Sequence, residues 1–191
     1  AASDVYKRQL LINISNISMK HLILIRHGQS EWNQQKRFTG WVDVGLTDKG
    51  RAEAKKAGEL IKWKKIKLDS FYSSYQKRAN DTLKIIMKEL NEDENLITRK
   101  WQLNERHYGE LTGLNKEDMK KKYGEEKIHQ FRRSWDVKPG ALDRKSPYHP
   151  LNIETYKDIP VTDIPDTESL KDTHKRVVDC YNELILKDLQ N

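Results

Sequence analysis

The chain has 191 residues, of which 36% are hydrophobic and 34% charged, which fits one globular domain, with or without a sizeable insertion, and excludes a disordered chain. The formal net charge of +7 fits an anionic substrate, a nucleic-acid partner or lysine-rich coding, and does not choose among them. No apolar run approaches the roughly 20 residues that span a bilayer, and the single cysteine, Cys180, can form no internal disulfide, which favours a reducing, cytoplasmic location.

The first residues differ in character from the rest of the chain. The apolar run Leu10–Ile12 follows two basic residues, as in a signal peptide, but Asn13 interrupts it and no small-residue cleavage site follows. We therefore expect residues 1–18 to be a non-native or untranslated leader. Met19 is then the start of a single domain over residues 19–191.

Strands and helices are expected to alternate from Met19 onward. Leu22–Ile25 is a continuous apolar run of strand length, which is typical of a strand buried on both faces of a parallel sheet. The next expected elements are a helix opened by Thr47 and running to about Lys62, a strand over 69–73, a helix from about Gln76 to Leu90 and a weaker strand over 96–103.

The alternation stops at residue 104. Residues 104–166 contain most of the prolines and only short expected helices, over about 115–123 and 125–136, so we interpret this stretch as a cap-like insertion. Thr167 then provides a capping signal for a final helix with an apolar face. Strand–helix alternation of this kind predicts an α/β fold, with a three-layer sandwich around a mostly parallel sheet.

The tripeptide Arg26-His27-Gly28 carries the strongest chemical signal. It follows the first expected strand, and in open α/β sheets ligands bind beyond the carboxyl ends of the strands. A histidine there can present a ring nitrogen as a nucleophile, the arginine can hold phosphoryl oxygens, and the glycine lets backbone N–H groups approach an anion. Taken alone, the tripeptide also fits a structural histidine at a strand end.

Further segments accompany the tripeptide along the chain. They read RHGQSEWNQQKRFTGW over 26–41, KRA over 77–79, NERHYG over 104–109, GLNK over 113–116 and FRR over 131–133. In this order and spacing they resemble the motifs of the 2,3-bisphosphoglycerate-dependent phosphoglycerate mutases, a family of the histidine phosphatase superfamily. The resemblance implies the fold of that superfamily. It also implies that 3-phosphoglycerate and 2-phosphoglycerate, intermediates of glycolysis and gluconeogenesis, are interconverted through a phosphohistidine, with 2,3-bisphosphoglycerate as primer.

The resemblance also implies roles for individual residues. His27 matches the phosphorylated nucleophile and Glu105 the general acid–base. Arg26 and Arg78 match the guanidinium groups that hold the transferring phosphoryl group, for which planar, forked donors are well suited. The matched substrate-binding residues are Asn33, Thr39, Gly40, Tyr108, Lys116, Arg132 and Arg133.

No metal is expected, because the sequence has no acidic ligand cluster and no glycine-rich nucleotide loop, and arginines can take the place of magnesium. The alternative activity is that of a phosphatase of the same superfamily, acting on a small phosphorylated metabolite. A mutase also needs a closing cap, for which residues 104–166 are the candidate. A nucleic-acid-binding module would leave the motifs unexplained, and a non-catalytic relative conflicts with competent residues at the matched positions, so we expect neither, nor a membrane partner.

The family resemblance further implies a strand that ends in a second His-Gly-Asn motif, and no segment of this sequence matches it. We therefore expect the C-terminal part of the domain to be missing and this chain to be impaired in the full mutase cycle. The complete enzyme is expected to be a homodimer or homotetramer.

Overall fold

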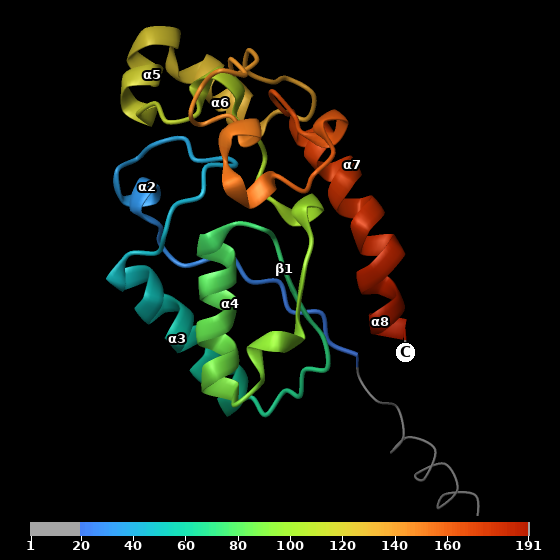
Figure 1. Cartoon of the computed structure of the whole chain (residues 1–191). Coiled ribbons are helices and arrows are strands. Elements are labelled where there is room, and N and C mark those ends of the chain that lie inside the picture. Colours follow the sequence, from blue (N-terminus) through green and yellow to red (C-terminus); the bar gives the residue numbers. More distant parts are fainter. Residues whose placement is uncertain (1–19, 191) are drawn as a thin grey trace, which may run out of the picture.

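The computed structural model describes residues 20–190, so the prediction about residues 1–18 lies outside the described residues. Figure 1 shows helices on both sides of the short strand β1 (Phe71–Ser73). Helices α3 (Asp48–Trp63) and α4 (Lys77–Leu90) lie on one side, and α7 (Leu170–Cys180) lies on the other. The predicted α/β class is confirmed, with helical layers enclosing a parallel sheet.

Helices α3 and α4 form where the sequence predicts them, because their end signals are local. The Thr47 hydroxyl accepts the Gly50 N–H and caps α3. Helix α4 begins after Gln76 and ends at Leu90, because the next residue, Asn91, has a left-handed backbone conformation that terminates the helix. The two helices pack closely, with Gly58 of α3 against α4.

The sheet is small. Strand β1 pairs in parallel with β2 (Ile97–Arg99), with Phe71 opposite Ile97, and both side chains pack on the buried Met87 of α4. The strands predicted over 69–73 and 96–103 are therefore confirmed in position but are shorter. The second gives way to a 3₁₀ turn over Trp101–Leu103, and another such turn, Glu94–Leu96, precedes β2.

The strand predicted over Leu22–Ile25 is wrong for this structure. Leu22, Leu24 and Ile25 are 46%, 85% and 43% exposed, and no backbone hydrogen bond within residues 20–190 joins them to β1 or β2. An apolar run becomes a strand only beside an edge that can accept its backbone groups. Arg26-His27-Gly28 therefore follows an irregular, exposed segment and not a strand.

The final helix begins two residues later than predicted. Ser169, not Thr167, is its N-cap, because Ser169 and Asp172 form a reciprocal capping box. The Thr167 hydroxyl instead donates to the Pro139 carbonyl. Ser169 is therefore the N-cap because Asp172, three residues later, completes the capping box.

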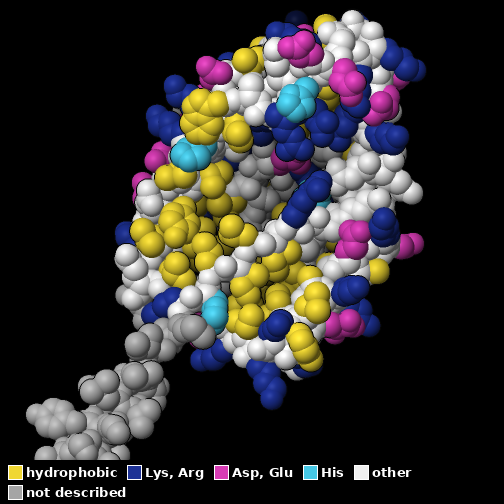
Figure 2. Space-filling view, turned by 180° about the vertical axis from the view of Figure 1, so that it is seen from behind, with side chains coloured by type: hydrophobic (Ala, Val, Ile, Leu, Met, Phe, Trp, Pro, Cys, Tyr) yellow, Lys and Arg dark blue, Asp and Glu magenta, His cyan; other side chains and the backbone are white. Residues whose placement is uncertain are grey.

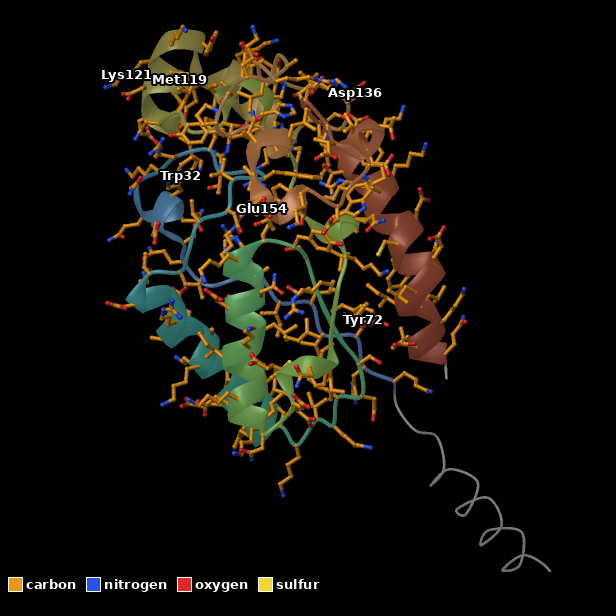
Figure 3. All side chains as sticks on the ribbon, in the orientation of Figure 1. Trp32, Tyr72, Met119, Lys121, Asp136 and Glu154 are labelled. Carbon is orange, nitrogen blue, oxygen red and sulfur yellow. The ribbon has the colours of Figure 1, made fainter. Side chains whose placement is uncertain are left out.

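Helix α7 continues through a π turn, Tyr181–Ile185, into α8 (Leu186–Gln190). The Asp188 carboxylate of α8 accepts hydrogen bonds from Tyr72 and Ser70, at and beside β1. Figure 3 shows Tyr72 directed from β1 toward this helix. These bonds fasten the C-terminal helical layer to the sheet.

Residues 104–166 form short helices and turns at one end of the molecule (Figure 1). Helices α5 (Lys116–Tyr123) and α6 (Glu125–Arg133) match the two predicted helices, although α6 ends earlier than expected. Short 3₁₀ turns cover Gly109–Leu111, Pro150–Asn152, Glu154–Tyr156 and Val161–Asp163, and the one-turn helix α2 covers Glu31–Gln34. Within the described part of the chain, no helix has the length and apolar character needed to cross a membrane.

Two apolar clusters fix this region to residues 38–41. Phe38 packs with Leu111 and with Ile128 and Phe131 of α6. Trp41 packs with Tyr156, whose hydroxyl donates to the Trp41 carbonyl at 2.6 Å. Burial of several aromatic side chains contributes a few kcal/mol each. The clusters therefore hold α5 and α6 over the segment that carries Thr39 and Gly40.

Candidate active site

Arg78 of α4 fixes the state of the His27 ring. The Arg78 guanidinium is fully buried, and its Nε donates to His27 Nε2 at 3.3 Å. Guanidinium nitrogens can only donate, so Nε2 must accept and the ring proton must lie on Nδ1. His27 Nδ1 lies 2.7 Å from the Gly28 carbonyl oxygen and donates to it. His27 thus directs an unprotonated Nε2 toward Arg78.

The same guanidinium also binds Glu105. Arg78 Nη2 donates to Glu105 Oε2 at 2.9 Å, and two further N–H groups donate to the carbonyls of Gly40 at 2.8 Å and Val42 at 2.9 Å. A buried guanidinium needs such partners to offset its desolvation. One side chain therefore joins a histidine nitrogen and a carboxylate that are 78 residues apart in the chain.

The environment of His27 favours the neutral ring. Burial lowers the pKa of His27 below its ordinary value of 6.5, and the charges of Arg78 and Arg26 lower it further. The hydrogen bond to Gly28 and the charge of Glu105 act in the opposite direction. A neutral imidazole with a free lone pair is the form that can act as a nucleophile.

Helix α4 and helix α3 both set the backbone of this segment. Gly28 N–H donates to the Thr82 hydroxyl at 3.2 Å, one helical turn from Arg78. A Cβ on Gly28 would lie 2.1 Å from the Gly50 carbonyl oxygen, and a Cβ on Gly50 would lie 2.1 Å from the Gln29 oxygen. Both positions therefore require glycine for a close backbone approach.

Lys116 lies within electrostatic range of Glu105 and of two further cations, Arg132 and Arg26. Burial lowers the pKa of Lys116, and the charges of Arg132 and Arg26 lower it further while Glu105 raises it. Figure 2 shows one face of the molecule that is hollowed, with Lys and Arg side chains gathered above the hollow and an apolar surface beside and below it. The predicted cations Arg26, Arg78, Lys116 and Arg132 thus act on one region, where Glu105 is the opposing carboxylate found among residues 20–190. This arrangement is suited to a multiply charged anion.

Thr39 and Gly40 lie against this group. The Gly40 carbonyl accepts from both Arg78 and the Gln76 amide, and Gly40 has a φ of +56°. A Cβ there would lie 3.2 Å from the Arg106 carbonyl oxygen. The buried Thr39 hydroxyl has no hydrogen-bond partner among residues 20–190.

Three predicted residues make less direct contact with His27, Arg78 and Glu105. The Asn33 side-chain oxygen accepts the Ser30 N–H in the capping box of α2 and makes no recorded contact with His27. The Tyr108 ring packs on Phe38 at 5.2 Å. Arg133 is exposed at the end of α6, and within the described residues no hydrogen bond or ion pair involves its side chain.

Sequence reasoning missed three residues that hold Glu105 in place: Gln76, Glu168 and Arg176. Gln76 Oε1 accepts the Glu105 N–H at 3.2 Å. Arg176 Nη2 donates to the Glu105 carbonyl at 3.1 Å and to Glu168 Oε2 at 2.8 Å. In the sequence these are polar residues beside helix starts or on a charged helix, with no pattern that distinguishes them from solvated ones.

No group of three or more histidine, cysteine or acidic side chains within residues 20–190 is arranged to hold a metal ion. The polar groups at the centre of the site are instead those of one histidine, one carboxylate and several cations. Their arrangement suits the binding of an anion and the exchange of a proton next to a nucleophilic nitrogen.

Comparisons with known proteins identify the family of this chain. Residues 22–149 match the histidine phosphatase superfamily (branch 1). The chain is 64% identical over 173 residues to a 2,3-bisphosphoglycerate-dependent phosphoglycerate mutase of Pelagibacter ubique, and the match covers 91% of the chain and 72% of that protein. A protein of the same name from Borreliella burgdorferi is 48% identical over 90% of the chain and 69% of its own length.

Solved structures share the fold. A protein described as mycobacterial hydrolase 1 superposes with a TM-score of 0.63 at 21% identity, over 85% of this chain and 64% of that one. A mycobacterial glucosyl-3-phosphoglycerate phosphatase gives the same TM-score and identity over 85% and 63%. The chain thus spans less than two thirds of these solved chains. It belongs to the histidine phosphatase superfamily and, within it, to the 2,3-bisphosphoglycerate-dependent phosphoglycerate mutases.

Proposed function

We propose that the protein containing this chain interconverts 3-phosphoglycerate and 2-phosphoglycerate, with the phosphoryl group carried on Nε2 of His27. One observation carries the assignment of residues: a single buried guanidinium, that of Arg78, donates to His27 Nε2 and to the Glu105 carboxylate. The relatives at 64% and 48% identity support the reaction, because both are named as mutases of this kind.

His27 is proposed as the nucleophile. In the transfer, a bond forms between Nε2 and phosphorus while the bond between phosphorus and the substrate oxygen breaks. In the structure the Arg78 Nε–H donates to the Nε2 lone pair. As attack proceeds, this N–H must donate to a phosphoryl oxygen instead, so that the lone pair can bond to phosphorus. The Nδ1 proton stays on the ring, where the Gly28 carbonyl holds it. Arg26 is proposed as a second guanidinium on the same phosphoryl group.

Glu105 is proposed as the group that moves the proton. As the substrate oxygen leaves phosphorus, a protonated Glu105 gives it a proton, and in the return transfer the carboxylate removes a proton from the attacking hydroxyl. The contact with Arg78 supports this role, because it places the carboxylate on the guanidinium that also contacts the nucleophile. Proton transfer of this kind contributes roughly 10²–10⁴ in rate.

Binding of the substrate is assigned to the surrounding side chains. Lys116 and Arg132 act electrostatically on the same region as Arg26, which fits them for the carboxylate of a phosphoglycerate and for the second phosphate of 2,3-bisphosphoglycerate. The remaining proposed contacts are Asn33, Thr39, Gly40, Tyr108 and Arg133. The excess of cations over the single carboxylate also fits 2,3-bisphosphoglycerate, which supplies the phosphoryl group that primes His27.

Phosphoryl labelling tests the proposal. The full-length protein is incubated with 2,3-bisphosphoglycerate labelled in its phosphoryl groups, and the acid-labile label is mapped by mass spectrometry. We expect label on His27, none in His27→Ala, and unchanged labelling in His129→Ala, which removes an exposed imidazole from α6. Undiminished label in His27→Ala would contradict the assignment.

A phosphatase acting on a small phosphorylated metabolite is the second candidate. The side chain of Glu105 is 36% exposed, so water can approach the carboxylate that a mutase keeps for its substrate. Measuring release of inorganic phosphate beside the interconversion of the two phosphoglycerates separates the activities, and we expect interconversion to be faster. A homodimer or homotetramer in the cytoplasm belongs to the same proposal, and light scattering of the purified protein checks the assembly.

A further inference from the structure

The backbone that carries Glu105 is held by a buried ion pair from a distant part of the chain. Arg176 of α7 pairs with Glu168, with Nε donating to Oε1 at 2.7 Å, and the two side chains are only 10% and 4% exposed. Ion pairs this deeply buried do not by themselves add stability, since desolvation offsets the attraction. The role of the pair therefore lies in the other groups that it binds.

Every N–H of the Arg176 guanidinium is used. Nη1 donates to the carbonyls of Gln102 at 2.6 Å and Asn104 at 2.8 Å, and Nη2 donates to the carbonyl of Glu105 at 3.1 Å. The remaining two donors bind Glu168. A rigid planar fork thus fixes three carbonyls within four consecutive residues.

Two further bonds complete the attachment of this segment. Glu168 Oε2 accepts the His107 N–H at 2.8 Å. Gln76 Oε1 accepts the Glu105 N–H at 3.2 Å, and its amide nitrogen donates to the Gly40 carbonyl at 2.7 Å. We name Gln76, Glu168 and Arg176 the backbone clamp. It holds the peptide groups on both sides of Glu105 while leaving the carboxylate free to meet Arg78.

We propose that Arg176, held by Glu168, is a positioning residue for proton transfer by Glu105. The inference rests on the proposed function of Glu105 as the acid–base. Of Glu105, Arg176 contacts only the backbone carbonyl and not the carboxylate, so it acts by setting where that carboxylate lies relative to Arg78 and His27. A displacement of about 1 Å at such a group can cost roughly 100-fold in rate.

The test compares two phosphoryl donors. Transfer from 2,3-bisphosphoglycerate needs a proton on the leaving oxygen, whereas 2,4-dinitrophenyl phosphate has a leaving group that needs none. We expect Arg176→Met to slow phosphorylation of His27 by the first donor about 100-fold and by the second less than about threefold. A lesion that merely loosened the fold would slow both equally. Arg176→Lys, which keeps a cation but not the fork, should recover part of the loss.

Arg144→Met is the matched control. Arg144 also forms a two-bond pair with a carboxylate, that of Asp166, but it makes no recorded bond to residues 102–107. We expect Arg144→Met to leave the rate of His27 phosphorylation unchanged with both donors. Since Arg176→Met leaves Glu168 buried without its cation, the double variant Glu168→Gln with Arg176→Met tests the same selectivity without a lone buried charge. If phosphorylation of His27 in a folded double variant were slowed by the same factor with both donors, relative to the parent protein, the proposal would be overturned.

Two further measurements separate this inference from the proposed function. Glu105→Gln should reproduce the donor selectivity; if it does not, the acid–base role of Glu105 is wrong. Hydrogen exchange of the Glu105 and His107 amides does not depend on catalysis. We expect both amides to exchange at least tenfold faster in the Arg176 variants than in the parent, and unchanged exchange would show that no clamp exists.

Discussion

Residues 26–28 and residues 102–107 carry the two halves of the candidate site, and they are held by different means. The histidine segment follows residues 22–25, of which Leu22, Leu24 and Ile25 are exposed, and is fixed by Arg78 and Thr82, one turn apart on α4. The glutamate segment is bound along its backbone by the backbone clamp. The site therefore has a preorganised acid–base side, and a nucleophile whose position depends on its contacts with α4 and with Gly50 of α3.

The largest expected effect concerns Arg78, which joins the two halves. We expect Arg78→Ala to lower kcat roughly 10²–10³-fold, the usual consequence of removing a charge contact from a transition state. Arg106→Ala should cost less than about tenfold, because Arg106 donates to the Arg132 carbonyl and supports the end of α6. Steady-state kinetics on folded variants measure both. Equal small losses would show that the anion lies elsewhere.

The burial of the glutamate segment predicts sensitivity to acid. Burial lowers the pKa of His107 to about 3, whereas in the unfolded chain it is near 6.5. The unfolded chain therefore binds the extra proton first, so stability is complete above pH 6.5 and falls as the pH decreases toward 3. The slope contributed by His107 should be about 1.4 kcal/mol per pH unit.

Urea unfolding at pH 7, 6 and 5 measures this slope, and His107→Gln should reduce it. His129→Gln is the control, because His129 is exposed on α6. An equally steep loss of stability in His107→Gln would place the acid-sensitive group elsewhere in the molecule.

A smaller effect is expected at the end of α6, where two neighbouring arginines differ in their surroundings. Arg132 acts electrostatically on Lys116, whereas Arg133 is exposed. Arg132→Ala should raise KM for 3-phosphoglycerate about tenfold, which corresponds to about 1.4 kcal/mol, and Arg133→Ala less than about threefold. Titration of the initial rate with substrate distinguishes them. The reverse order would show that the substrate turns toward Arg133.

The smallest effect is predicted before the histidine. Leu24 is 85% exposed, so Leu24→Ser should change the free energy of unfolding of this chain by less than about 0.5 kcal/mol. Leu111→Ala, in the cluster under α6, should cost about 2–5 kcal/mol. Urea unfolding of both variants compares them. A large loss for Leu24→Ser would mean that residues 22–25 pack against a surface.

Some parts of the fold and of the candidate site were predictable from the sequence, and others were not. Helix α3 was predictable from its Thr47 cap and helix propensity, and α4 from its apolar spacing, because these signals are local. The resemblance to the mutases singled out His27, Arg78 and Glu105, which lie together in the structure. The strand over residues 22–25 was not predictable from its own apolar character, because a strand depends on the edge beside it. Arg176 and Gln76 were missed because only tertiary contact separates them from solvated polar residues.

The close approach of Gly28 and Gly50 couples two segments that are 22 residues apart in the chain. The first turn of α3 therefore determines how closely the histidine segment can approach that helix. One added methyl group at either glycine would have to push a backbone aside by about an ångström. For mutational tolerance, position 50 therefore belongs to the active site although its residue touches no reacting atom, and a library that varies α3 should find it as constrained as the residues beside His27.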